Sequence, residues 1–391
     1  MDRTQPHLIT LILLTALTVL SLNMFLPALP AMQASFGVSE AVIGRAISIY
    51  MAAAAVLQLI LGPLSDRIGR RPVILGLLAI YAVASVMCLL AEDITLFLIA
   101  RVAQAVAVGG GILASAVVRD LFDGRSAAAK LSLIASAMAV APMLAPMIGG
   151  LLEAAFGWRS IFVAYAVLGL GLLVWCWRDL GETKARGAMS MRGIGGLLRV
   201  RLYWAYVGVQ ALGVGVFYVF LTGAPFVMVE AFGLGTAQTG IVLGSTTAGF
   251  LVGAGASARL VERVGELRLI LLGRAVPVIG IGAACIYFAF GGAALWPLLV
   301  ATLCVGLGNG FSIPSAAAGA LSVRPELAGS ASGISGSVML ALGAVLTGLA
   351  TLIVEAQTTP LALLSLMGAI ATGALIAALA VRAWVGAAQA G

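Results

Sequence analysis

The chain carries, between two long apolar runs, the sequence Gly62-Pro-Leu-Ser-Asp-Arg-Ile-Gly-Arg-Arg-Pro-Val-Ile-Leu75. Its two glycines, one carboxylate and three arginines form a composition that the interior of a bilayer does not accept. Glycine allows close backbone approach and a positive φ, and Pro72 suits the first turn of the helix that follows. We therefore predict a tight cytoplasmic turn between two membrane-spanning helices.

A weaker copy of this turn lies about half the chain later, at Ala258-Arg-Leu-Val-Glu-Arg-Val-Gly-Glu-Leu-Arg-Leu-Ile-Leu271. In the copy, Glu262 takes the place of Asp66, and an arginine and a glycine recur at the same spacing. The copy predicts that the chain consists of two related halves.

The composition is typical of a membrane protein. Of the 391 residues, 62% are hydrophobic and 9% are charged, whereas a soluble protein has about 25% charged residues. Apolar runs of roughly 20 residues, which are long enough to cross a bilayer, recur throughout. We therefore predict an all-α membrane protein of twelve spans. These spans are expected at 8–30, 40–62, 72–91, 94–119, 128–152, 159–178, 203–229, 237–258, 268–290, 294–321, 328–354 and 359–382.

The basic residues predict the orientation and the division into halves. Most of the 22 basic residues flank the segments expected on the cytoplasmic side, and the outer loops hold mainly acids, as the positive-inside rule requires. Both termini are then cytoplasmic. One long polar loop separates the sixth span from the seventh, so we predict six-helix bundles at 1–178 and 203–391, joined by a cytoplasmic linker at 179–202.

Several classes of function are not expected. The net charge of +7 does not indicate nucleic-acid binding, because the basic residues are scattered singly through short loops. The four cysteines show no paired spacing and His7 is the one histidine, so we expect no metal site and no cofactor. No convergent set of catalytic groups points to an enzyme.

Further motifs narrow the class of protein. They are Leu26-Pro27-Ala-Leu-Pro30, Arg101-Val-Ala-Gln104, Val118-Arg119-Asp120-Leu-Phe122, Ala145-Pro146-Met-Ile-Gly149-Gly150 and Gly157-Trp158-Arg159-Ser-Ile-Phe162. Together with the turn at 62–75, they resemble the major facilitator superfamily, and within it the bicyclomycin and chloramphenicol resistance (Bcr/CflA) family of twelve-helix drug:proton antiporters. One position departs from that family's pattern, because Asn23 stands where an aspartate is usual, and asparagine cannot carry a proton.

The resemblance implies gating roles for two regions. The turn would latch the halves together inside, with Asp66 facing the start of helix eleven near 325–329, where the helix dipole favours a carboxylate. Helix five, bent at its prolines, would seal the outer side. A solvated, topology-setting loop and plain packing of small residues are the alternatives. The predicted gating residues are Gly62, Asp66, Arg67, Gly69, Arg70, Arg71, Arg119, Asp120, Pro142, Pro146, Gly149 and Gly150.

A buried arginine suggests where substrate binds. Arg101 lies inside the fourth span, where its cost requires a bundle interior or a wet cavity. We expect it to form a polar patch with Gln104 and Asn23, and a snorkelling arginine is the alternative. Aromatic, polar and methionine side chains would complete an adaptable pocket, although such aromatics commonly just pack. The predicted substrate residues are Asn23, Met24, Tyr50, Gln58, Arg101, Gln104, Met138, Phe217, Tyr218, Phe220, Asn309, Phe311 and Met339.

These observations lead to a functional expectation. We expect a monomer in the bacterial inner membrane that exports small apolar antibiotics, neutral or weakly anionic and phenicol-like or bicyclomycin-like, by proton antiport. The proton gradient would supply the energy. No carboxylate lies in the middle of a span, so the candidates for proton coupling are Asp120 and Glu230 at span edges. The alternatives are an uncoupled facilitator or metabolite exporter, suggested by Asn23, and a non-transporting membrane sensor or scaffold.

Overall fold

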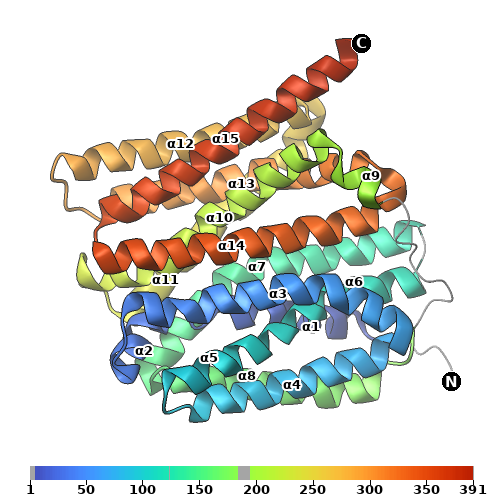
Figure 1. The fold of residues 1–391 in the computed structure, drawn as a ribbon, viewed down its shortest axis with the longest axis horizontal. Coiled ribbons are helices and arrows are strands. Elements are labelled where there is room, and N and C mark those ends of the chain that lie inside the picture. The colour runs from blue at the N-terminus through green and yellow to red at the C-terminus, as the bar shows by residue number, and fades with distance from the viewer. Residues whose placement is uncertain (1–4, 123, 184–193, 391) are drawn as a thin grey trace. The chain divides into compact units, whose positions relative to one another are not determined.

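The computed structural model describes residues 5–122, 124–183 and 194–390, and within these ranges every regular element is a helix. Twelve of the described helical segments are long and apolar enough to cross a membrane, which confirms the predicted all-α class (Figure 1). In chain order the elements are α1 (Leu8–Asn23), η1 (Leu26–Ala28), α2 (Leu29–Phe36), α3 (Glu40–Ile68), α4 (Arg70–Leu90), α5 (Ile94–Gln104), η2 (Ala105–Ala107), α6 (Val108–Leu121), α7 (Gly124–Phe156), α8 (Arg159–Asp179), α9 (Ile194–Leu198), α10 (Arg201–Glu230), α11 (Thr236–Val264), α12 (Glu266–Ala289), α13 (Trp296–Ser322), η3 (Pro325–Leu327), α14 (Ala328–Ala356) and α15 (Pro360–Ala390).

Two spans are interrupted by short 3-10 turns. The first span consists of α1, η1 and α2, and it runs from Leu8 to Phe36, beyond the predicted end at residue 30. Pro27 and Pro30 lie in the first turns of η1 and α2, where a residue without an N–H is tolerated. The fourth span is broken in the same way, at η2 between α5 and α6. The break in the first span brings Phe25 to a bend rather than into a continuous helix.

The predicted turn at 62–75 consists of a single glycine between two long helices. Gly69 separates α3 from α4 with a φ of 118°, and Gly265 separates α11 from α12 with a φ of 84°. Such positive φ values are accessible to glycine without strain and are costly for other residues. The recurrence of glycine in the two copies of the motif therefore has a backbone cause.

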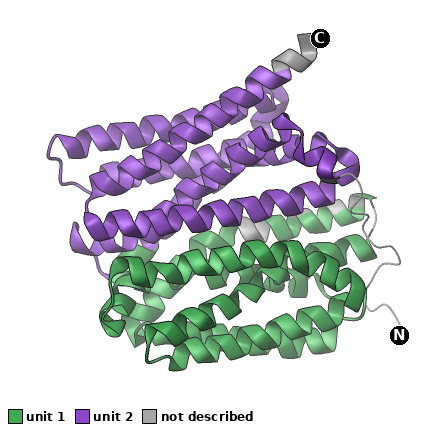
Figure 2. Ribbon diagram, viewed as in Figure 1, with its two compact units in different colours: residues 1–190, 236–240 green, residues 191–235, 241–391 purple. Residues whose placement is uncertain are grey.

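The chain forms two compact units (Figure 2). Unit 1 comprises residues 1–190 and 236–240, and unit 2 comprises residues 191–235 and 241–391. In unit 1, α1 packs against α6 and α7, and α4 packs against α5 and α8. In unit 2, α10 packs against α13, α14 and α15, while α12 packs against α13 and α15. Of the predicted linker 179–202, residues 184–193 lie outside the described ranges.

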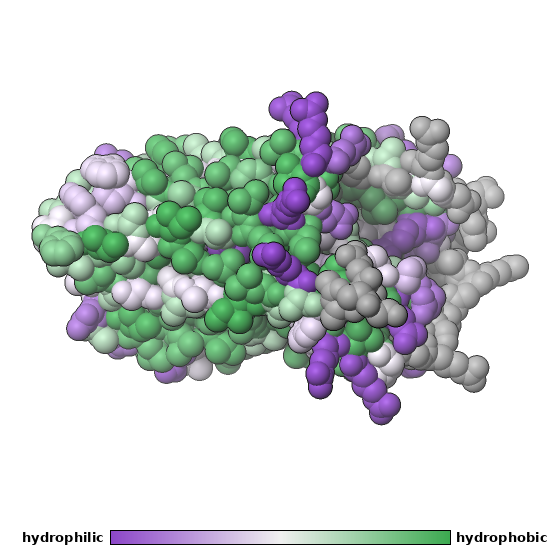
Figure 3. Space-filling model, turned by 90° about the horizontal axis from the view of Figure 1, so that it is seen from above, coloured by the Kyte–Doolittle hydropathy of each residue, from purple (hydrophilic) through white to green (hydrophobic). Residues whose placement is uncertain are grey.

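The surface of the helices is apolar along most of its length. On the face drawn in Figure 3, hydrophobic residues cover the helices and hydrophilic residues gather toward one end. Large apolar side chains such as Val167, Trp177 and Ile279 are more than half exposed. A bilayer is the solvent that accepts such a surface, because water would penalise it.

Candidate functional site

The guanidinium of Arg101 is the centre of a buried polar cluster in unit 1. The helix that carries it, α5, is preceded by Asp93, whose Oδ1 accepts the backbone N–H of Leu96 at 2.9 Å and caps the first turn. Arg101 lies in the last turn of α5 and is fully buried. The sequence prediction of an interior arginine thus agrees with its burial, and its hydrogen bonds are internal.

All the hydrogen-bond acceptors of Arg101 are neutral. Its Nη1 donates to Gln104 Oε1 at 2.6 Å and to the Ser21 carbonyl oxygen at 3.3 Å. Its Nε donates to the Ala46 carbonyl oxygen at 3.3 Å. These contacts tie α5 to α1 and α3 without an opposite charge. Across the described ranges, no Asp or Glu side chain is buried.

Two aromatic rings take the position that a counter-ion would occupy. The guanidinium carbon of Arg101 is 4.2 Å from the ring centroid of Phe25 and 4.6 Å from that of Tyr50. The negative faces of aromatic rings attract a cation, with about 0.5–2 kcal/mol for each pair. Tyr50 was predicted as a substrate residue, whereas Phe25 was quoted only as part of a motif.

Gln104 connects the arginine to α4. Its Oε1 accepts from Arg101, and its Nε2 donates to Ser85 Oγ at 2.8 Å. The hydroxyl of Ser85 donates in turn to the Tyr81 carbonyl oxygen at 2.7 Å. The predicted pair Arg101 and Gln104 is therefore a directly bonded unit.

Asn23 is buried but makes no hydrogen bond with that pair among the described contacts. Its Nδ2 donates to the Val19 carbonyl oxygen of its own helix at 2.8 Å, and its Oδ1 is buried without a partner. Arg101 Nη2 is likewise buried without a partner, whereas the hydroxyls of Tyr50 and Tyr81 both interact with that of Ser21. Because buried polar atoms are nearly always paired, the unpaired atoms of Asn23 and Arg101 mark the region as a place for polar groups of a ligand or solvent.

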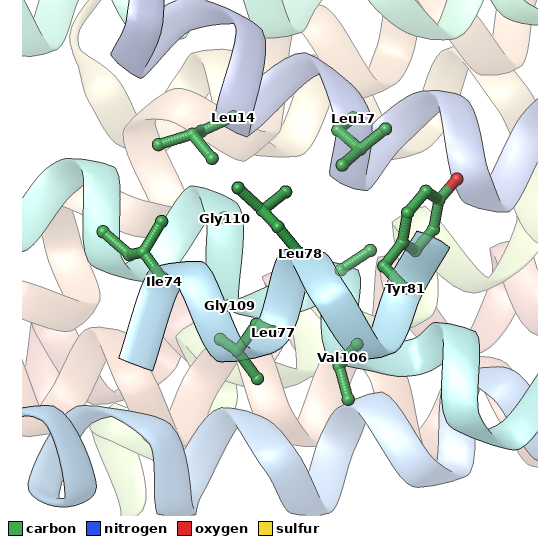
Figure 4. Close-up of a pocket in the computed structure, with 10 residues that line it drawn as sticks. Leu14, Leu17, Ile74, Leu77, Leu78, Tyr81, Val106, Gly109 and Gly110 are labelled. Atoms are coloured by element: carbon green, nitrogen blue, oxygen red, sulfur yellow. The ribbon is translucent and has the colours of Figure 1, made fainter. Parts of the chain in front are cut away.

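A small cavity lies beside the cluster, between α1, α4 and α6. Figure 4 shows its lining, in which Tyr81 is joined by apolar side chains such as Leu14, Leu17 and Leu78. Its volume of about 10 Å³ leaves room for no more than a single water. The described structure is thus closed around this end of the cluster.

The turn between α3 and α4 forms an ion-pair network around Arg70. Its Nη2 is 2.7 Å from Asp66 Oδ1, and its Nε is 2.9 Å from Asp120 Oδ2. Its Nη1 also donates to Ser65 Oγ. The turn therefore holds two of the predicted motif acids with one arginine, and it links α3 and α4 to the end of α6.

A carboxylate that the sequence analysis did not single out caps this turn. Glu182 Oε1 accepts the backbone N–H of Arg70 at 2.9 Å and that of Thr183 at 3.0 Å. The first of these is at the start of α4, where a carboxylate suits the positive end of the helix dipole. Arg71 adds a second tie, from its Nη2 to the Trp177 carbonyl oxygen at 2.8 Å. The sequence indicated this contact only by the presence of an acid, Glu182, in the predicted linker.

The motif at 145–150, which lies on α7, packs closely against the end of α1. Pro142 and Pro146 lie inside the continuous helix α7. A Cβ atom added at Gly149 would overlap the backbone carbonyl of Met24, so the glycine permits a contact that no other residue would allow. Met138 is on the same helix, but its side chain lies outside the described residues.

In unit 2, some of the predicted substrate residues on α10 and α13 are used in contacts between helices. Gln210, a further polar residue of α10, donates from its Nε2 to the Ala316 carbonyl oxygen at 3.4 Å. Asn309 Nδ2 donates to the Gly213 carbonyl oxygen at 3.1 Å. The rings of Phe217 and Tyr218 lie 5.6 Å apart. Asn309 lines a gap between α10, α12 and α13 that has no room for a water molecule.

The remaining candidates are spread over several helices. Met24 and Phe220 are buried, whereas Gln58, Phe311 and Met339 are half-buried. Arg119 and Glu230 are exposed near helix ends. Arg67, another of the predicted gating residues, also has an interaction partner.

Sequence reasoning missed a buried arginine in unit 2. Arg274 lies in α12 with 2% of its surface exposed. Its Nη2 donates to Asn309 Oδ1 at 2.8 Å, to the Gly308 carbonyl oxygen at 3.2 Å, and to Ser312 Oγ. The sequence did indicate this residue as a candidate, because an arginine inside an apolar run is as costly here as at Arg101.

A bundle of twelve spanning helices, with a buried polar cluster in each unit, is the architecture of a multi-pass membrane transporter. The chain belongs to the Major Facilitator Superfamily, whose family model matches residues 11–348. This confirms the predicted superfamily and places the chain with transporters of small molecules rather than with enzymes.

Relatives with similar sequences include proteins named for drug resistance. The chain is 29% identical over 347 residues to a chloramphenicol resistance protein of Pseudomonas aeruginosa, covering 87% of this chain and 81% of the relative. It is 30% identical over 319 residues to the multidrug resistance protein MdtL of Escherichia coli, covering 80% of this chain and 81% of that protein. These relatives agree with the predicted branch of the superfamily.

Solved structures share the fold at lower identity. A bacterial homologue of the human lysosomal transporter Spinster matches with a TM-score of 0.72 at 16% identity, covering 95% of this chain and 93% of that one. The nucleoside transporter NupG matches with a TM-score of 0.73 at 15% identity, covering 96% and 99%. At these identities the likeness concerns the fold alone.

Proposed function

We propose that this transporter exports small, largely apolar antibiotics that are neutral or weakly anionic, with phenicol-like and bicyclomycin-like compounds as the first candidates. The observation that carries the proposal is Arg101, a buried cation held only by neutral acceptors and aromatic rings. Such a charge favours a neutral or electron-rich substrate and repels a lipophilic cation. The names of the two relatives support the choice of compound.

The proposed mechanism is alternating access between two six-helix halves, at 1–178 and 203–391, joined by the linker at 179–202. The ion-pair network of Asp66, Arg70 and Asp120 would serve as the cytoplasmic latch. The close contact at Gly149 would keep the outer side sealed. We propose cytoplasmic termini, following the basic residues of the loops, and a monomeric protein.

Proton antiport would drive export. The candidates for proton coupling are Asp120, which is already paired with Arg70, and Glu230, which is exposed at the end of α10. A second function, uncoupled facilitation, is favoured by one specific observation: Asn23 is buried where a titratable acid would be useful, and it cannot titrate. Proton release on addition of chloramphenicol to purified protein separates the two functions, because only the antiporter exchanges one for the other.

A susceptibility panel in a pump-deficient host tests the export function. Wild-type protein should raise resistance to chloramphenicol and bicyclomycin at least fourfold and leave resistance to ethidium unchanged. Arg101→Ala should lose this resistance, because it removes the buried cation and leaves its acceptors unpaired.

Arg45→Ala is the matched control, since Arg45 is an exposed arginine on α3. It should retain the wild-type resistance at equal expression. Equal resistance to ethidium and chloramphenicol in the wild type would contradict the proposed charge preference, and resistance to neither would contradict the export function.

A further inference from the structure

The interior of unit 2 contains one buried charge that the proposed function does not use. Arg274 is on α12, and its guanidinium reaches Gly308, Asn309 and Ser312 on α13. Its Nε is buried without a hydrogen-bond partner. The site is tightly packed, because a Cβ atom added at Gly213 on α10 would overlap the guanidinium.

No acid neutralises this charge among the described residues of unit 2. The five glutamates there are all exposed, and each lies at or near the end of a helix: they are Glu230, Glu262, Glu266, Glu326 and Glu355. The acceptors around Arg274 are carbonyl, amide and hydroxyl oxygens. Unit 2 therefore repeats the arrangement of unit 1, where Arg101 also has only neutral acceptors.

A purely structural role does not require the charge. A neutral amide such as glutamine could donate to the same oxygens on α13, at much lower cost in a bilayer. An ionisable side chain inside a membrane span is for this reason a functional candidate by default. What the arginine adds over a neutral donor is a positive potential that the surrounding apolar residues do not screen.

The charge is hydrogen-bonded to Asn309, a residue proposed to contact the substrate. Asn309 accepts from Arg274 and donates to the Gly213 carbonyl oxygen, so the arginine fixes which way the amide faces. Gly213 is one helical turn from both Gln210 and Phe217 on α10. The potential of Arg274 therefore acts on the wall formed by α10 and α13.

We propose that Arg274 is a specificity-determining residue, which makes unit 2 favour substrates with an anionic group and disfavour lipophilic cations. This inference rests on the proposed export function and deepens it, by extending the substrate class from neutral and weakly anionic compounds to fully ionised organic acids. Arg274 acts by its charge and by holding Asn309.

The test measures export of three probes by the full chain in proteoliposomes: chloramphenicol as the neutral probe, fluorescein as the anion and ethidium as the cation. In the wild type, fluorescein should be exported at least tenfold faster than ethidium. In Arg274→Gln, the ratio of fluorescein to chloramphenicol export should fall about tenfold, while chloramphenicol export stays within threefold. Arg274→Lys should keep most of the ratio, because it keeps the charge.

A second variant neutralises the charge without removing the arginine. Asn309→Asp places a carboxylate in the position 2.8 Å from Arg274, and it should lower the same ratio about tenfold. This variant decides the matter if Arg274→Gln fails to insert. Arg268→Gln, at an exposed arginine in the first turns of the same helix, is the control and should match the wild type.

Three results would overturn the inference. They are equal export of fluorescein and ethidium by the wild type, unchanged probe ratios in inserted Arg274→Gln or Asn309→Asp protein, and a proportional loss of all three probes. With chloramphenicol still exported by the wild type, the first two results reject the role of Arg274 and leave the export function standing. A wild type that exports none of the probes rejects both.

Discussion

At the scale of single residues, the protein has two arginines inside its spans, Arg101 and Arg274, and no carboxylate of the described residues bonds to either. Insertion of an arginine at the centre of a span costs about 2.5–3.5 kcal/mol on translocon scales. A hydrogen bond to a charged group contributes about 1.5–3 kcal/mol, and each cation–π contact adds about 0.5–2 kcal/mol. Three acceptors and two rings surround Arg101, so its neutral surroundings offset the cost of placing it inside a span.

A glycine next to Arg274 gives a prediction at this scale. In Gly213→Ala, the added Cβ atom overlaps the buried guanidinium and its contact with Asn309, and overpacking of this kind costs about 1–3 kcal/mol. We expect a lower melting temperature in detergent and a loss of export. Gly208→Ala on the same helix is the control, because its Cβ atom would make an ordinary contact 3.5 Å from Ala377. A Gly213→Ala protein as stable as Gly208→Ala would show that the cluster is loosely packed.

At the scale of helices, the structure depends on close contacts that sequence motifs encode with glycine. Gly149 allows α7 to touch the backbone at Met24, where α1 ends. Gly69 allows α3 to turn into α4 within one residue. In both places the glycine of the motif meets a requirement of the backbone and supplies no functional group. The polar and charged side chains of the motif are next to it in the sequence.

The contact of α7 with α1 predicts the effect of a single methyl group. Gly149→Ala should separate the two helices and reduce export at least tenfold, since its Cβ atom has no space beside the Met24 carbonyl. Gly76→Ala on α4, where nothing lies within 4 Å of the added atom, should behave as wild type. The comparison is made by chloramphenicol efflux at matched membrane levels. Wild-type efflux by Gly149→Ala would argue against a sealing role for this contact.

The turn between α3 and α4 gives a prediction about gating. Asp66→Asn removes one of the two carboxylates that hold Arg70 and leaves the pairing with Asp120 in place. The protein should therefore insert and keep its melting temperature within a few degrees, while transport falls at least fivefold. Efflux and thermal stability measured on the same preparation separate the two effects. Full transport by Asp66→Asn would remove the proposal of a latch.

At the scale of the whole molecule, the apolar runs and the two glycine turns predicted the helical class and its spans. These features are local in sequence: a span of about 20 apolar residues and a glycine at a positive φ can both be found without knowledge of packing. The superfamily could also be recognised from the sequence alone, because its motifs are short and continuous.

The contacts of the sites were harder to predict, because they join residues far apart in the chain. Arg70 and Asp120, which pair with each other, were both predicted as gating residues, whereas the cap that Glu182 places on α4 was not predicted. Phe25 beside Arg101 could not be found from spacing, because the 3-10 break after α1 determines where its ring lies. Arg274 was overlooked although its position inside an apolar run was a sufficient signal.

Uptake of labelled chloramphenicol into proteoliposomes with an acidic interior tests the central claim most directly. Because an antiporter exchanges outward-moving protons for inward-moving drug in this geometry, the wild type should accumulate chloramphenicol above its equilibrium level. The accumulation should disappear with nigericin and in Arg101→Ala, and it should persist in Arg45→Ala. Uptake that only equilibrates and ignores the pH gradient would contradict proton-coupled export and favour an uncoupled facilitator.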